Sequence, residues 1–248
     1  MATAGAKQQK PIDLYYWPTP NGWKVTIMLE ECRLPYRIVP VNIGAGEQFK
    51  PSFLRISPNN RMPAIVDPAG PGGKPVSVFE SGAILQYLGR KTGRFYPRAE
   101  RARVAVDEWL FWQMGGLGPM AGQAHHFRQY APMILAKDKN AKLKTTYGAT
   151  RYTNEVNRLY GVMNKQLRGK DYLCGSYSIA DMACWPWVVP YKRQGQKLED
   201  FPHLKKWFER MQARPAVQRG FEAGRELREQ APAANDAARR ILFGQKAR

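Results

Sequence analysis

Acidic residues are scarce in this chain of 248 residues. Only 20 Asp and Glu oppose 39 Lys and Arg, so the formal net charge is +19. An excess of this size attracts polyanions and anionic substrates through long-range fields. It does not by itself indicate nucleic-acid binding, which needs a basic patch with a groove-reading element or stacking aromatics. The charge therefore fits an anionic ligand, and we do not expect nucleic acid as a partner.

Cysteine and histidine are also rare. The three cysteines are scattered and form no C-x-x-C pair: Cys32, Cys174 and Cys184. This excludes a disulfide framework and a zinc site, and it is typical of a protein in the reducing cytoplasm. We expect all three to be packing residues. The adjacent His125 and His126 would diverge on a helix, so we expect packing or cleft lining there and no metal site.

Long hydrophobic runs are absent. No apolar segment reaches the length that spans a membrane, so we expect no membrane partner. Residues 1–10 have no apolar core and no cleavage pattern, which indicates a short disordered tail rather than a secretion signal. We therefore expect a globular protein located in the cytoplasm.

The first ninety residues alternate between strand and helix patterns. Strands are expected at Ile12–Tyr16, Tyr36–Val41, Pro63–Asp67 and Val76–Phe79, with helices at Trp23–Arg33, at Pro51–Ile56 and after Glu80. The alternation at the start implies a parallel strand pair, and the last two strands form an antiparallel hairpin. The sequence thus predicts an α/β thioredoxin-like domain over residues 11–93.

Helical patterns dominate the rest of the chain. Helices are expected at Glu100–Gln113, Thr145–Leu167 and Pro202–Arg214, and Ser178 and Asp181 have the spacing of an N-capping box before an apolar run. We predict an all-α domain over residues 99–222. A basic and flexible tail should follow over residues 223–248, with one optional helix at residues 237–243. In residues 137–170, nine Lys and Arg face two acids, which fits a solvated basic helix or an anionic partner.

The segment Arg61–Leu88 combines two features of a binding site. Met62-Pro63 is an X-Pro bond, the only type with appreciable cis content, and a cis bond there would turn the Met62 backbone outwards to pair with an extended peptide. Ser81 can cap the following helix, whose N-terminus favours a carboxylate. The segment therefore predicts a site for a small acidic peptide.

Long motifs now suggest a family. The segments MPAIV and FESGAILQYL, together with YSIADMACWPW, resemble those of soluble glutathione transferases. YYWPTPNGWKV, GEQFKPSFLRISPNNRMPAIVD and WLFWQMGGLGPMAGQAHHF are similar to the nu class, glutathione-dependent disulfide-bond oxidoreductases related to the yeast nitrogen-regulation prion protein. The resemblance covers roughly residues 11–220. It implies a homodimer that binds glutathione, either reduced or as glutathione disulfide.

The resemblance also implies roles for individual residues. The cysteinyl backbone of glutathione would pair with Met62 beside Pro63, and Gln48 would hydrogen-bond the glycyl end. Glu80 would take the α-ammonium group, while the hydroxyl and N–H of Ser81 would take the γ-glutamyl carboxylate. In isolation, Glu80 and Ser81 could equally be an exposed acid and an ordinary helix cap.

The expected catalytic position after the first strand contains no cysteine. Common glutathione transferases place Tyr, Ser or Cys there, whereas in the nu class the residues matching Thr19 and Asn21 contact the glutathione sulfur. Turn chemistry alone would also explain a Thr-Pro-Asn-Gly sequence, and the two interpretations are compatible. Tyr15 and Tyr16 lie within the strand, where we expect them to belong to the core.

If the protein exchanges disulfides, the missing cysteine means that the thiols must come from bound ligand, either two glutathione molecules or glutathione disulfide. The resemblance then implies disulfide reduction, and the alternatives are conjugation of electrophiles or a non-catalytic glutathione-binding regulator. Arg151 would reach the glutathione of the partner subunit, although a solvated arginine is an alternative. The glycines in residues 115–118 follow a helix, and we interpret them as a kink that makes room for a second ligand.

Overall fold

The computed structural model describes residues 10–229 and 235–246. Its N-terminal part contains a sheet in the order β2-β1-β3-β4, formed by β1 (Ile12–Tyr16), β2 (Tyr36–Pro40), β3 (Ala64–Asp67) and β4 (Val76–Phe79). β1 and β2 are parallel, while β3 is antiparallel to both β1 and β4. The expected strands and the hairpin are thus confirmed. The expected tail over residues 1–10 lies, except for its last residue, outside the described residues.

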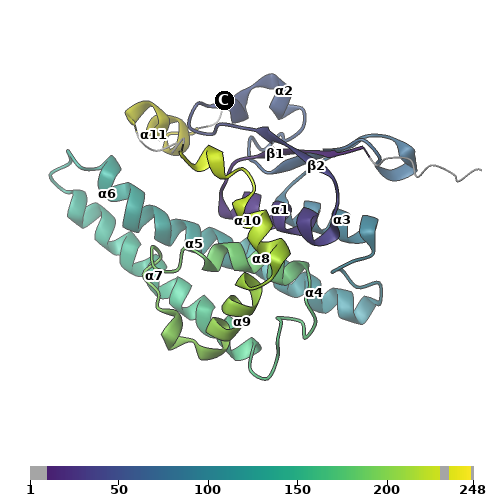
Figure 1. Ribbon diagram of the computed structural model, residues 1–248. Coiled ribbons are helices and arrows are strands. Elements are labelled where there is room, and N and C mark those ends of the chain that lie inside the picture. The colour runs from purple at the N-terminus through teal and green to yellow at the C-terminus, as the bar shows by residue number, and fades with distance from the viewer. Residues whose placement is uncertain (1–9, 230–234, 247–248) are drawn as a thin grey trace, which may run out of the picture.

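The helices of this part lie on both faces of the sheet. Figure 1 shows α1 (Pro20–Cys32) and α3 (Ser81–Thr92) on one side and the short α2 (Pro51–Leu54) on the other. Thr19 caps α1, because its side chain accepts a hydrogen bond from the Gly22 N–H. Capping moves the start of this helix three residues ahead of the position expected from its apolar spacing.

The expected cap at the start of α3 is wrong. Glu80 holds the cap position in a left-handed conformation (φ 68°), without a side-chain capping bond, and Ser81 is the first helical residue. The reason is tertiary: the buried hydroxyl of Ser81 accepts a hydrogen bond from Lys24 on α1. Ser81 therefore faces into the protein at the junction of the two helices.

The second part of the chain is helical, as expected. Its helices are α4 (Glu100–Trp112), the π-helical turn η3 (Gln113–Leu117), α5 (Gly118–His125), the π-helical turn η4 (His126–Tyr130), α6 (Ala131–Ile134), α7 (Ala141–Gln166), α8 (Ile179–Val188), α9 (Pro202–Gln212) and α10 (Pro215–Glu222). The predicted capping box of Ser178 and Asp181 is present at the start of α8. Almost every residue of α8 is buried, and Figure 1 shows this helix in the middle of the helical part.

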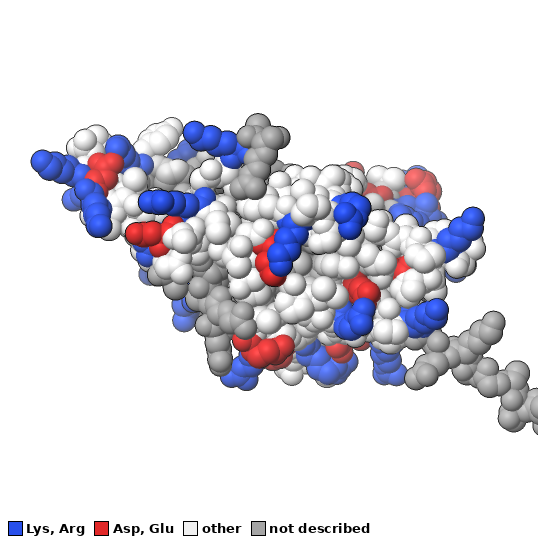
Figure 2. Space-filling view, turned by 90° about the horizontal axis from the view of Figure 1, so that it is seen from above, with Lys and Arg blue, Asp and Glu red and all other residues white. Residues whose placement is uncertain are grey.

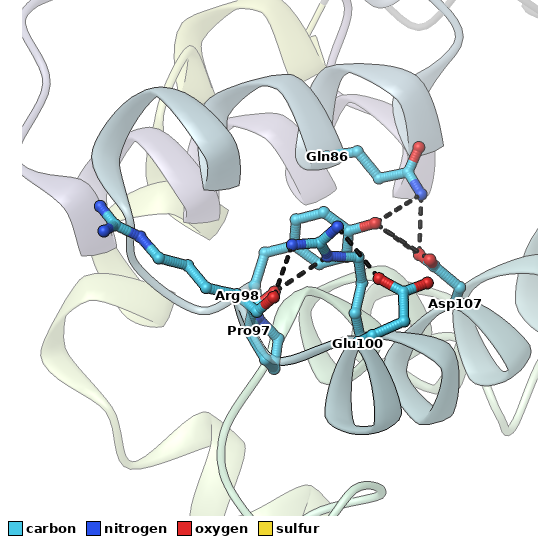
Figure 3. A network of polar contacts seen from close by, with 7 residues as sticks. Gln86, Pro97, Arg98, Glu100 and Asp107 are labelled. Atoms are coloured by element: carbon cyan, nitrogen blue, oxygen red, sulfur yellow. Dashed lines mark hydrogen bonds and ion pairs between the residues drawn. The ribbon is translucent and has the colours of Figure 1, made fainter.

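A polar network joins α3 to α4 across the link between the two parts (Figure 3). Gln86 on α3 donates to the Asp107 carboxylate on α4 at 2.7 Å, and the Tyr96 hydroxyl lies 3.0 Å from both oxygens of the same carboxylate. Arg103 donates to the backbone carbonyl of Pro97 at 3.1 Å. These contacts hold the segment between α3 and α4 in place. The two parts of the chain are thus joined by polar contacts and also share one apolar core.

The C-terminal segment returns to the N-terminal part. The optional helix is present as α11 (Asp236–Phe243), and Figure 1 shows it beside the loops near α2. The Phe243 ring lies 5.0 Å from the His126 ring, and Ile241 borders Gly46. None of the described helices is both long enough and apolar enough to cross a membrane. On the face seen in Figure 2, Lys and Arg are spread out among Asp and Glu.

Candidate functional site

A cavity of about 310 Å³ lies where α1, α3 and the segment before β3 meet. This volume is at the lower end of the range for small-molecule sites, about 300–1,000 Å³. The cavity is lined by Asn21, Ile43, Gln48, Asn60, Arg61, Met62, Pro63, Glu80, Ser81, Met114, Leu242 and Gln245. Six of the expected site residues, drawn from four separate segments, are therefore brought together.

Met62 provides an open peptide edge. The Met62-Pro63 bond is cis, as expected, and Met62 lies two residues before β3. Within the described part of the chain, no hydrogen bond uses the Met62 backbone N–H or C=O. Both groups are thus available to an extended ligand, which could pair with Met62 through main-chain hydrogen bonds.

Two buried acceptors in the cavity have no partner among the described residues. Gln48 is 1% exposed and its Nε2 donates to the Ile43 carbonyl, which leaves Oε1 unpaired. Asn60 Oδ1 is also buried and unpaired. An unpaired buried acceptor costs about 1–3 kcal/mol, so a ligand N–H would stabilise either oxygen. Gln48 Oε1 is accordingly suited to an N–H donor of a ligand.

The start of α3 provides the charged end of the cavity. Glu80 is exposed and accepts a 3.3 Å hydrogen bond from Asn59, so its carboxylate can also meet an ammonium group. Ser81 follows at the first helical position, where backbone N–H groups and the helix dipole favour an anion. A zwitterionic amino-acid head group matches this pair of residues.

Thr19 and Asn21 lie at the start of α1. Asn21 lines the cavity, and its Oδ1 accepts a hydrogen bond from Trp187 Nε1 at 3.1 Å, so its NH₂ group remains free to donate. Thr19 does not line the cavity, but its hydroxyl lies 3.9 Å from Met62 Sδ. The interpretation of Thr19 as a helix start is confirmed. Contact of either residue with a ligand sulfur remains a prediction.

The protein thiols are poor nucleophiles. Burial raises the pKa of Cys32, that of Cys174 to about 11, and that of Cys184 well above its usual range. Tyr16 is buried and donates its hydroxyl to the Ala223 carbonyl, and burial also raises its pKa. Tyr16 and Cys184 are therefore core residues, as expected.

Arg151 is not part of this cavity. It lies on α7, its side chain is 54% exposed, and it pairs with Glu155 at 3.6 Å. Its expected role toward a partner subunit remains a prediction, because it concerns a second copy of the chain.

Several residues that line the cavity were not expected there from the sequence. Met114 belongs to η3, while Leu242 and Gln245 come from the C-terminal segment. Lys24 lies directly behind Ser81 and was not considered. The apolar spacing of residues 238, 241 and 242 was the available signal for α11, but nothing in the local sequence indicated the surface that this helix covers.

Comparison with known proteins identifies the class. Family models of the glutathione S-transferase N-terminal and C-terminal domains match residues 10–90 and 131–215. The chain therefore belongs to the glutathione S-transferase family. Both the family and the fold class expected from the sequence are confirmed.

The chain is similar to several individual members of this family. The chain is 53% identical to the disulfide-bond oxidoreductase YfcG of Escherichia coli, over 83% of this chain and 92% of that protein. It is 32% identical to the transcriptional regulator URE2 of Saccharomyces cerevisiae, over 85% of this chain and 68% of that protein. A glutathione transferase from Pseudomonas putida, solved with one glutathione disulfide bound per subunit, superposes with a TM-score of 0.79 at 40% identity, covering 89% of this chain and 94% of the other.

Proposed function

We propose that this protein is a glutathione-dependent disulfide-bond oxidoreductase that uses the thiols of bound glutathione. The observation that carries the proposal is the cavity itself. It joins the unpaired backbone groups of Met62, an amino-acid head-group site at Glu80 and Ser81, and Asn21 from the cysteine-free segment at the start of α1. The similarity to the disulfide-bond oxidoreductase YfcG and the glutathione disulfide bound by the Pseudomonas putida enzyme support the same function.

The chain would act by orientation and electrostatics. Two glutathione molecules reduce one disulfide: their sulfurs become joined, the substrate S–S bond breaks, and two thiol protons pass to the released sulfurs. Asn21 would donate its free NH₂ to the reacting sulfur, and the Thr19 hydroxyl would donate from the other side of the turn. Hydrogen bonds to a thiolate and the N-terminus of α1 both lower a thiol pKa. Gly115 and Gly116 directly follow Met114, which lines the cavity, and a side chain added at either glycine would contact no neighbouring group, so this segment would offer room for a second ligand.

We also propose a cytoplasmic homodimer. Val104 and Phe111 lie seven residues apart on α4, and Leu143 and Tyr147 lie four apart on α7, with exposures of 47%, 66%, 78% and 79%. Exposed apolar faces of this kind mark interfaces. Arg151 follows Tyr147 by four residues and so lies on the same face of α7, where a partner subunit would be within its reach. The free cysteines fit a reducing compartment.

Two measurements test the activity. The first compares glutathione-dependent turnover of a model disulfide, such as bis(2-hydroxyethyl) disulfide, with conjugation of 1-chloro-2,4-dinitrobenzene, each corrected for the uncatalysed rate. Disulfide reduction should dominate. Conjugation that is faster by orders of magnitude would show a conjugating transferase, and negligible turnover of both substrates would favour a binding protein.

The second measurement uses a variant with no cysteine, carrying Cys32→Ser, Cys174→Ser and Cys184→Ala. Because the proposed thiols belong to glutathione, this variant should keep its disulfide reductase activity within about threefold when folded, as expected for changes outside the site. Loss of activity in a variant with an unchanged circular dichroism spectrum and unchanged glutathione affinity would point to a protein thiol.

A further inference from the structure

Lys24 is a buried cation without a carboxylate partner in the described part of the chain. Its side chain is 1% exposed, and Nζ donates to Gln113 Oε1 at 2.7 Å, Ser81 Oγ at 3.2 Å and Met114 Sδ at 3.3 Å. All three acceptors are neutral. Burying an ammonium group is costly unless its charge is paired, so this lysine lowers stability unless another component supplies the negative charge.

The position of Lys24 shows where that charge would come from. Ser81 and Met114 both line the cavity, and Lys24 lies immediately behind them. Because Ser81 Oγ already accepts from Lys24, its own hydrogen is available for donation. That hydrogen points to Met114 Sδ at 3.6 Å, a weak acceptor. A ligand carboxylate at the start of α3 would be a stronger acceptor and would lie one hydroxyl away from the ammonium group.

The titratable groups around Lys24 do not neutralise it. Burial lowers the pKa of Lys24 to about 7, while the charges of Cys184 on α8 and Glu80 at the start of α3 act in the opposite direction. The Cys184 thiol stays protonated because burial raises its own pKa. Glu80 has an exposed carboxylate that makes no contact with Nζ. The two residues of η3 that contact Lys24, Gln113 and Met114, are uncharged.

We propose that Lys24 is a positioning residue for glutathione: its ammonium group pairs, through the Ser81 hydroxyl, with the γ-glutamyl carboxylate, and ligand binding draws a proton onto Lys24. This inference rests on the proposed function, since it needs glutathione in the cavity. A purely structural role, in which Lys24 only ties α1 to η3 through Gln113, would stabilise the fold without coupling it to ligand binding. Proton uptake separates the two roles.

The test is isothermal titration calorimetry with S-methylglutathione, whose capped sulfur cannot titrate. Binding to the wild-type protein is measured between pH 6 and pH 9 in two buffers with different ionisation enthalpies. If the ligand raises the pKa of Lys24 by one to two units, uptake near pH 8 should be about 0.4 to 0.8 proton. Affinity should fall as the pH rises above about 7, because the free protein then loses the charge.

Lys24→Met removes the charge and keeps an unbranched apolar chain in the buried position. The variant should bind S-methylglutathione about 10- to 100-fold more weakly, the usual range for a lost charged hydrogen bond, and should lose the uptake seen near pH 8. Lys91→Met is the matched control. Lys91 pairs with Asp67 at 2.7 Å, and neither residue lines the cavity, so affinity and uptake should remain those of the wild type.

Three results would overturn the inference. The first is wild-type binding without net proton uptake at any pH in the range, which needs no variant and so does not depend on whether Lys24→Met folds. The second is a folded Lys24→Met protein with unchanged affinity and uptake. The third is a wild-type protein that binds no S-methylglutathione, which would refute the proposed glutathione site as well. In the first two cases the glutathione site itself would stand.

Discussion

Asn21 connects the cavity to the helical domain, and its two functions can be separated by substitution. Its Oδ1 accepts a hydrogen bond from Trp187 Nε1 across 166 positions of the sequence, which orients the NH₂ group as a free donor. Asn21→Ala removes both contacts. A hydrogen bond to a charged group contributes about 1.5–3 kcal/mol. Loss of a donor to the thiolate should therefore lower kcat/KM for disulfide reduction by about 10- to 150-fold.

Stability should fall in the same variant for a different reason. The Trp187 N–H would lose its acceptor, which costs about 1–3 kcal/mol when the group is buried and less at this half-buried position. Asn21→Asp distinguishes the effects. A carboxylate keeps the acceptor for Trp187 but replaces the donor with a negative charge, which raises the pKa of a neighbouring thiol.

The assay combines steady-state kinetics over a pH series with chemical denaturation and glutathione titration. Asn21→Asp should unfold close to the wild-type midpoint and yet lose at least as much activity as Asn21→Ala. Its rate profile should shift to higher pH, because the glutathione thiol ionises later. An Asn21→Asp protein with near wild-type kcat/KM would refute the donor role. Equal losses in turnover and glutathione affinity would show that Asn21 only shapes the turn.

Three further predictions concern α1 and the helical domain. Thr19→Ala should destabilise the protein by about 1 kcal/mol through loss of the α1 cap and should also lower turnover, whereas Thr19→Ser should restore both in denaturation and kinetic assays. Asp181→Ala should cost at least about 3 kcal/mol in thermal unfolding, because its carboxylate accepts two backbone N–H groups, a serine hydroxyl and an indole N–H in the core, and each buried donor left without an acceptor costs about 1–3 kcal/mol; a loss below 1 kcal/mol would contradict this. Because burial lowers the pKa of Lys24 from 10.5 to about 7, the unfolded chain binds more protons between these values. Wild-type stability should therefore rise with pH by up to about 1.4 kcal/mol per unit relative to Lys24→Met, and parallel pH profiles for the two proteins would contradict the shift.

Local patterns were sufficient for much of the fold. Short β-rich and apolar runs located β1 to β4 within one residue at each end, and the spacing of Ser178 and Asp181 located the start of α8. These features depend on residues a few positions apart, so their physics is contained in a short segment. The predicted starts of α1 and α7 were less accurate, because both helices begin before the expected residue. The Thr19 cap and the first turn of α7 lie outside the apolar stripe on which the predicted boundaries were based.

The resemblance to a family supplied the site residues that local patterns could not. Gln48 and Glu80 are unremarkable in isolation, and the order of the strands and helices alone does not show that they share a cavity. The structure brings them together because the end of β1, the beginning of β3 and the start of α3 lie at the same end of the sheet. The expected role of Arg151, contact with glutathione in a partner subunit, stays a prediction because it requires a second copy of the chain.

The sequence by itself determined the fold class and the absence of a cysteine at the turn before α1, and it predicted an acidic-peptide site next to Met62-Pro63. Only the tertiary structure decided that Ser81 turns inward, that α11 borders the cavity and that Lys24 is buried. The contacts of Lys24 with Ser81 and Gln113 cross 57 and 89 positions. A lysine on an amphipathic helix is ordinarily expected at the surface. It becomes a buried charge behind the cavity only when α3 and η3 close over α1, and no pattern within one helix carries that information.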